Sequence, residues 1–125
     1  MSDAHATQRF QEAVQAFRGL EEKLRGKISS VAPKKIDAVL IDLAAAIPGL
    51  TGEDLGRAMV FKAYVFHWRY LTELSKKVLF NVDAPVDPRL TEALEEARKG
   101  RELLRAPGDL KWAEATVEQL EEYQR

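Results

Sequence analysis

The side chains of this 125-residue chain that could do chemistry are polar residues placed on apolar helical stripes. Arg57, Tyr64 and His67 follow the three- and four-residue steps of a stripe that otherwise carries valine and leucine. Glu21 lies near the centre of a second apolar stripe, and Arg101 lies on a third. A buried charge is costly unless it is paired, so we expect these residues to be partners of one another. We expect Glu21 to accept hydrogen bonds from Arg101, His67 or Arg57, and another from the Tyr64 hydroxyl.

This polar cluster has two interpretations. In the first, it only fixes the register of the helices, as single polar residues do in coiled-coil seams. In the second, Glu21, Arg57, Tyr64, His67 and Arg101 line a pocket that binds a small ligand or anion. His67 could then act as an acid or a base, because the ordinary pKa of histidine is the nearest to neutrality. The first interpretation is favoured, since the sequence shows neither a second catalytic group nor a substrate.

Composition and spacing exclude several kinds of site. The chain has no cysteine, which rules out disulfides, thiolate metal sites and a cysteine nucleophile. His5 and His67 both lack the glutamate three residues before them that di-iron bundles use, and glycine-rich phosphate loops are absent. Acidic pairs at 92/95 and 118/121 have a spacing that suits Mg²⁺, but they point away from the apolar stripes and are interpreted as solvated faces. We therefore predict no metal and no cofactor.

Positive charge is concentrated in one segment. The whole chain is nearly neutral, with 19 basic and 20 acidic residues, which argues against a globally basic nucleic-acid-binding protein. Residues 18–35, however, form a basic corner without interleaved aromatic residues. Phosphate contact there is one interpretation, and pairing with an acidic fourth or fifth helix, within the fold or across a dimer, is another. The candidate nucleic-acid contacts are Lys23, Arg25, Lys27, Lys34 and Lys35.

The elements that position these residues are predicted to be helices, because apolar residues recur at helical steps and no strand-like alternation is found. Proline- and glycine-containing breaks separate five of them. Short connections favour antiparallel neighbours. We therefore predict an all-α fold, an antiparallel bundle of four to five helices that forms a single domain over residues 1–125. The predicted helices span about 4–30, 33–47, 52–80, 88–105 and 110–123.

The predicted third helix, about 52–80, is aromatic-rich and carries six of the ten aromatic residues. Its one narrow polar stripe, expected to face solvent, comprises Lys62, Arg69, Glu73 and Lys76. The second helix is also apolar on nearly all sides. A five-helix monomer covers one such helix more easily than two, so the surplus predicts a subunit interface, by default that of a symmetric homodimer. The interface candidates are Phe61, Val65 and Trp68.

Taken together, the sequence favours a small non-enzymatic helical-bundle protein that acts through protein–protein association, as a homodimer. Nucleic-acid binding by the basic corner and a ligand-binding or catalytic bundle around His67 are the alternatives. The longest apolar run is far shorter than the roughly 20 residues that a membrane helix needs. The segment MSDAHATQRF lacks the apolar core of a secretory signal. We therefore expect a cytoplasmic protein without membrane contact.

Overall fold

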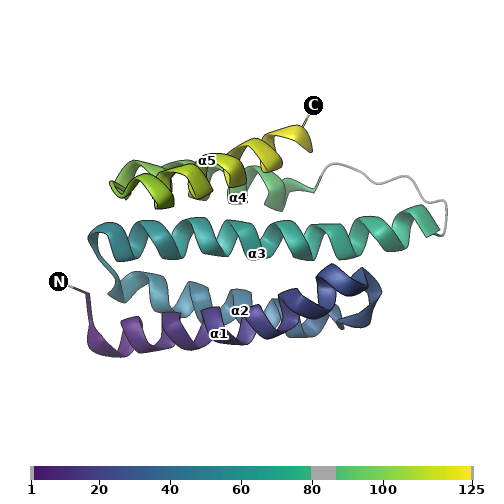
Figure 1. Ribbon diagram of the computed structural model, residues 1–125, viewed down its shortest axis with the longest axis horizontal. Coiled ribbons are helices and arrows are strands. Elements are labelled where there is room, and N and C mark those ends of the chain that lie inside the picture. Colours follow the sequence, from purple (N-terminus) through teal and green to yellow (C-terminus); the bar gives the residue numbers. More distant parts are fainter. Residues whose placement is uncertain (1, 80–86, 125) are drawn as a thin grey trace.

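The computed structural model describes residues 2–79 and 87–124, which form five α-helices and two short 3₁₀ turns. Helices that follow one another in the chain run antiparallel (Figure 1). The predicted all-α antiparallel bundle is therefore confirmed. In chain order the elements are α1 (Ala4–Gly26), η1 (Ile28–Ser30), α2 (Pro33–Ala46), η2 (Ile47–Gly49), α3 (Gly52–Leu79), α4 (Pro88–Leu103) and α5 (Pro107–Glu122).

Some helix ends differ from those predicted. The first helix ends at Gly26 rather than near residue 30, because Lys27 adopts an extended backbone (φ −155°, ψ 113°) and a 3₁₀ turn follows. The last helix begins at Pro107, earlier than residue 110, because proline suits a first helical turn, where its missing N–H costs no hydrogen bond. The predicted end of the third helix, Phe80, lies outside the described residues, as does the side chain of Lys76.

The long helix α3 is a central layer between two helical hairpins, α1–α2 on one face and α4–α5 on the other (Figure 1). Both hairpins pack against α3. Among the described residues, no Cα atom of α1 or α2 lies within 8 Å of one in α4 or α5. The core is therefore divided into two parts that share α3 as a common wall.

This arrangement explains why α3 is apolar on two opposite sides. Phe61 and Val65 are 3% and 0% exposed in a core with Phe17 of α1, and Ala63 is buried against α4 and α5. The prediction that Phe61 and Val65 lie at a subunit interface is therefore corrected, because the α1–α2 hairpin of the same chain covers them. Trp68, the third interface candidate, is half-buried and packs against the same core.

The sides of α3 that neither hairpin fully covers form two flanks. The flank between α2 and α4 carries Lys62, Arg69 and Glu73, and we call it the α2–α4 flank. Lys62 and Arg69, expected to meet solvent, have side chains only 31% and 14% exposed. The helices on either side supply acids to both of them: Lys62 Nζ lies 3.2 Å from Glu96 of α4, and Arg69 Nε lies 2.8 Å from Asp37 of α2. The opposite α1–α5 flank carries Arg57 and Tyr64, with α1 and α5 beside it.

Candidate functional site

Glu21 is a buried acid, as its position on an apolar stripe predicts. It is 6% exposed on α1, and the Tyr64 hydroxyl of α3 donates a hydrogen bond to its Oε2 atom. Arg18 donates to Oε1 at 2.8 Å, and Arg25 lies 3.4 Å from Oε2. The predicted bond from Tyr64 is therefore confirmed. The predicted bonds from Arg57, His67 and Arg101 are wrong, because the cationic partners of Glu21 come from neighbouring turns of its own helix.

The electrostatics of this cluster favour a carboxylate beside a neutral phenol. Burial raises the pKa of Glu21, but hydrogen bonds from Tyr64 and Arg18 and the charges of Arg18 and Arg25 outweigh it, so the net shift is downward. Burial and the hydrogen bond to Glu21 raise the pKa of Tyr64. Both carboxylate oxygens have donors within the fold, so the cluster holds α1 against α3.

Arg57 lies two turns before Tyr64 on α3 but belongs to a separate network. Its Nη2 atom donates to Asp54 at 2.7 Å, and its Nη1 atom donates to Asp109 at the start of α5 at 3.1 Å. Asp54 also accepts a hydrogen bond from the Ser2 hydroxyl at 3.1 Å. This network joins the beginning of the chain, α3 and α5 at one end of the bundle.

Between these two networks, the α1–α5 flank contains a pocket of about 290 Å³. Its lining residues are Phe10, Val14, Arg18, Arg57, Phe61, Asp109 and Trp112. The Arg18 guanidinium lies 5.4 Å from the centre of the Phe61 ring. Both arginines are engaged with carboxylates, Arg18 with Glu21 and Arg57 with Asp109. The pocket therefore has apolar walls beside two cations that already have carboxylate partners.

His67 does not join the Glu21 cluster, because its ring points toward the end of α5. Its Nε2 atom lies 2.7 Å from the Tyr123 hydroxyl, and the two rings stack with centroids 5.5 Å apart. Burial lowers the pKa of His67 to about 4, so the ring is neutral at neutral pH. Tyr70 also contacts Tyr123, with the two ring centres 4.9 Å apart. Sequence reasoning missed Tyr123 as the partner, since periodicity within α3 carries no information about which residue of α5 lies opposite.

Arg101, the last candidate for the predicted pocket, is separate from all of these groups. It is half-buried in the last turn of α4, where its carbonyl accepts the N–H of Leu104 at 3.1 Å. Within residues 2–79 and 87–124, its side chain has neither an ion pair nor a hydrogen bond. The five polar residues that the sequence groups together are therefore divided among four places in the fold.

The basic corner lies where α1 ends and α2 begins. Its lysines are Lys23, Lys27, Lys34 and Lys35; all four are exposed, and in the described part of the chain none forms an ion pair. Arg25 differs, because it pairs with Glu21 and lies 5.7 Å from the centre of the Trp68 ring. Among the described residues, no ion pair joins this corner to α4 or α5, which lie on the other side of α3.

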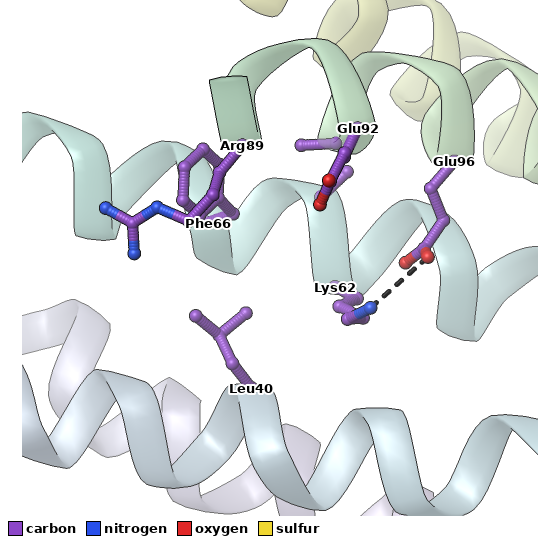
Figure 2. Close-up of a pocket in the computed structure, with 8 residues that line it drawn as sticks. Leu40, Lys62, Phe66, Arg89, Glu92 and Glu96 are labelled. Carbon is purple, nitrogen blue, oxygen red and sulfur yellow. Dashed lines mark hydrogen bonds and ion pairs between the residues drawn. The ribbon is translucent and has the colours of Figure 1, made fainter. Parts of the chain in front are cut away.

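The α2–α4 flank contains a groove that the sequence did not reveal (Figure 2). Its volume is about 190 Å³, and Figure 2 shows α2 contributing Leu40, α3 contributing Lys62 and Phe66, and α4 contributing the opposite rim. The rim residues of α4 are Arg89, Glu92, Ala93 and Glu96. The Arg89 guanidinium lies 5.3 Å from the centre of the Phe66 ring. Leu40 and Phe66 give the groove an apolar floor between charged rims.

The exposed face of α2 is unusually apolar. Ile41, adjacent to Leu40, is 69% exposed, the most exposed large hydrophobic side chain among the described residues. Ala38 and Ala45 lie three and four residues from Ile41 and are exposed on the same face of α2. The signal for this surface was present in the sequence as the apolar circumference of the second helix. Among the described residues, the large hydrophobic side chain with the greatest exposure therefore lies on α2 rather than on α3.

Comparisons of the chain with protein-family models, with curated proteins and with solved structures find no match. Within the described ranges, no three acidic or histidine side chains are grouped so that they could hold a metal ion. None of the helices, over the residues described, has both the length and the apolar character needed to cross a membrane. A proposal about function must therefore start from the surfaces described above.

Proposed function

We propose that this chain is a non-enzymatic helical-bundle protein that acts by associating with itself, as a homodimer. The observation that carries the proposal is Ile41, an aliphatic side chain 69% exposed on α2. A single exposed aliphatic residue is ordinary on a protein surface. Ile41, however, directly follows Leu40, which lines the groove with Phe66, so α2 presents aliphatic side chains both at the groove and on its exposed face. Covering such a surface with a second copy removes it from water.

The interior supports the same proposal. Glu21, Tyr64 and His67, the residues on which a ligand-binding or catalytic bundle would depend, all have partners inside the fold. His67 is neutral and stacked on Tyr123. Glu21, which the sequence grouped with His67, accepts a hydrogen bond from Tyr64 and not from His67. These polar groups act as links between helices, which is the structural interpretation of a polar residue on an apolar stripe.

Sedimentation equilibrium and light scattering at micromolar concentration test the proposal. The wild-type chain should give twice the 14.1 kDa monomer mass. Ile41→Glu should give the monomer mass, because it places a charge in the contact. Ala16→Glu is the matched control: it adds the same charge to an exposed alanine of α1 and should leave the dimer intact. A 14.1 kDa species at every concentration of the wild-type chain would overturn the proposal.

The basic corner supports a second candidate function, contact with nucleic-acid phosphates. The supporting observation is that Lys23 and Lys27 are exposed without an ion pair among the described residues. Binding to a duplex should weaken steeply as salt is raised, and Lys23→Glu/Lys27→Glu should abolish it while leaving the surface of α2 unchanged. If the wild-type chain is not retained on DNA or RNA at low salt, this candidate is removed.

A further inference from the structure

We infer that the pocket of the α1–α5 flank binds a small, flat aromatic ligand that carries one carboxylate. The ring of this ligand lies beside Phe10, Phe61 and Trp112, and its carboxylate faces Arg18. The inference goes beyond self-association and does not depend on it. The pocket exists because α1 and α5 pack on opposite sides of α3, and over the described residues their backbones do not approach one another. Side chains of all three helices line the space that is left.

The middle of the pocket is aromatic. Phe61 of α3 is 3% exposed, and the ring centres of Phe10 on α1 and Trp112 on α5 each lie 6.3 Å from that of Phe61. Val14 adds an aliphatic side chain to the lining. Binding pockets for small molecules are typically lined in this way, with a few polar groups at fixed places. The volume of about 290 Å³ exceeds the roughly 150 Å³ of an apolar cavity that holds benzene, so it suits two fused rings.

The two networks that flank the pocket differ in charge. In one network, Arg18 and Arg25 share a single carboxylate, that of Glu21, so positive charge is in excess. In the other, three carboxylates surround Arg57, so negative charge is in excess. These three are Glu53 at 3.6 Å, Asp54 at 2.7 Å and Asp109 at 3.1 Å. An anionic group is therefore favoured at the Arg18 end alone, and a ligand with a carboxylate at each end is disfavoured.

Arg18 has the donors that a second carboxylate needs. A guanidinium has five N–H groups, and in the described part of the chain only one of them, on Nη1, donates to a protein acceptor, Glu21 at 2.8 Å. The side chain is 53% exposed, and the guanidinium lies 5.4 Å from the centre of the Phe61 ring. A carboxylate here would form charge-assisted hydrogen bonds while its ring contacts the aromatic walls. The bond from Arg18 to Glu21 is kept.

The same contacts argue against a cationic or a neutral ligand. Arg18 already occupies a position over the Phe61 ring that suits a cation, and its charge would repel a second one. A neutral aromatic molecule would contact the walls but would gain no charge-assisted hydrogen bond from Arg18. A monoanion gains from both parts of the pocket.

Three naphthalene derivatives with the same ring system test the inference: naphthoate, naphthamide and naphthalenedicarboxylate. In heteronuclear NMR titrations, naphthoate should shift the indole N–H signal of Trp112 saturably, with a Kd of about 1 mM or tighter. The indole signal of Trp68, which does not line the pocket, should not shift. Naphthamide and naphthalenedicarboxylate should each bind more weakly by about fivefold or more.

Two arginine variants locate the carboxylate. Arg18→Gln should raise the Kd for naphthoate by about tenfold or more, because it removes the charged donor. Arg25→Gln is the matched control, since Arg25 also pairs with Glu21 and lies over an aromatic ring, that of Trp68, but does not line the pocket. It should change the Kd by less than about threefold, because solvent screens a charge that does not touch the ligand. Both arginines are exposed, so circular dichroism of the two variants should match the wild type.

A third variant, Val14→Phe, fills the pocket without changing its charge and should also weaken binding. If naphthoate does not shift the Trp112 signal saturably, the site is wrong. If naphthamide binds as tightly as naphthoate, the assignment of a carboxylate ligand is wrong. If Arg18→Gln and Arg25→Gln weaken binding equally, the carboxylate does not face Arg18. None of these results bears on self-association, which is measured by molecular mass.

Discussion

Gly56 of α3 and Gly100 of α4 lie backbone against backbone where these two helices cross. A Cβ atom on Gly56 would lie 2.7 Å from the carbonyl oxygen of Gly100, and one on Gly100 would lie 2.8 Å from the carbonyl oxygen of Gly56. Real Cβ contacts are longer than these, so neither position accepts a side chain unless the helices separate. This reciprocal contact sets how closely the α4–α5 hairpin approaches α3.

Gly56→Ala or Gly100→Ala should therefore lower the free energy of unfolding by about 1 to 3 kcal/mol, measured by chemical denaturation. The opposing gain in helix propensity, about 1 kcal/mol at most, is smaller than the cost of moving a backbone. Gly19→Ala is the matched control, since a Cβ there meets nothing within 4 Å and the residue is exposed on α1. It should be neutral or stabilising. Equal stability of all three variants would contradict the close contact.

The bond between Glu21 and Tyr64 can be measured by a double-mutant cycle. Glu21→Gln and Tyr64→Phe should each destabilise the fold by about 1 to 2 kcal/mol, because the first replaces the buried carboxylate shared by Tyr64 and two arginines with a neutral amide, and the second removes the hydroxyl that donates to Oε2. The loss stays moderate because Arg18 and Arg25 are 53% and 64% exposed and can be solvated when the carboxylate is removed. The double variant should lose less than the sum of the two. Glu22→Gln, exposed on the same helix, should change little; strict additivity would show that no bond exists.

His67 should make the stability of the protein depend on pH. Its pKa falls from 6.5 to about 4 on folding, so the unfolded chain binds the proton more tightly between these values. The contribution is fully present above pH 6.5 and is lost as the pH falls toward 4. Allowing for screening at this partly exposed ring, the loss is about 1 to 2 kcal/mol. Thermal denaturation of His67→Gln should show a flatter slope in this range, and an identical slope in both proteins would refute the assignment.

Two ion pairs on different surfaces should contribute unequally. Arg69 is 14% exposed and bridges Asp37 of α2 and Glu73 of α3 at 2.8 Å each. Arg69→Ala should cost about 1 to 2 kcal/mol, because Asp37 loses its cation and Glu73 keeps only Arg89, at 3.0 Å. Arg98→Ala removes a pair with Glu121 from a side chain that is 47% exposed, and it should change stability by less than about 1 kcal/mol. Urea denaturation distinguishes the two, and equal losses would mean that Arg69 is as well solvated as Arg98.

The sequence predicts which side of a helix a residue occupies better than it predicts what lies opposite. Periodicity within α1 predicts that Glu21 is buried. Because a buried carboxylate needs partners and Tyr64 also lies on an apolar stripe, the hydrogen bond between them could be predicted. The partner of His67 could not be predicted in this way, because its contact with Tyr123 depends on where α5 lies against α3. The position of α5 is set by the packing of two hairpins on a shared helix, and local periodicity does not encode it.

The error about the apolar third helix has the same origin. The aromatic content of α3 indicated more apolar surface than one chain could cover, yet Val65 is fully buried by the α1–α2 hairpin. A helix in a central layer has two covered faces rather than one. Among the described residues, the most exposed large hydrophobic side chain is instead Ile41, on α2.

Among the described residues, α3 is the helix whose backbone lies close to both hairpins, so the α1–α2 and α4–α5 hairpins are coupled mainly through it. Amide hydrogen exchange should therefore reveal separate opening units, with α4–α5 able to loosen while α1–α2 keeps its protection. A ligand or protein that contacted both the α1–α2 and the α4–α5 hairpins would couple their opening and make unfolding a single cooperative event.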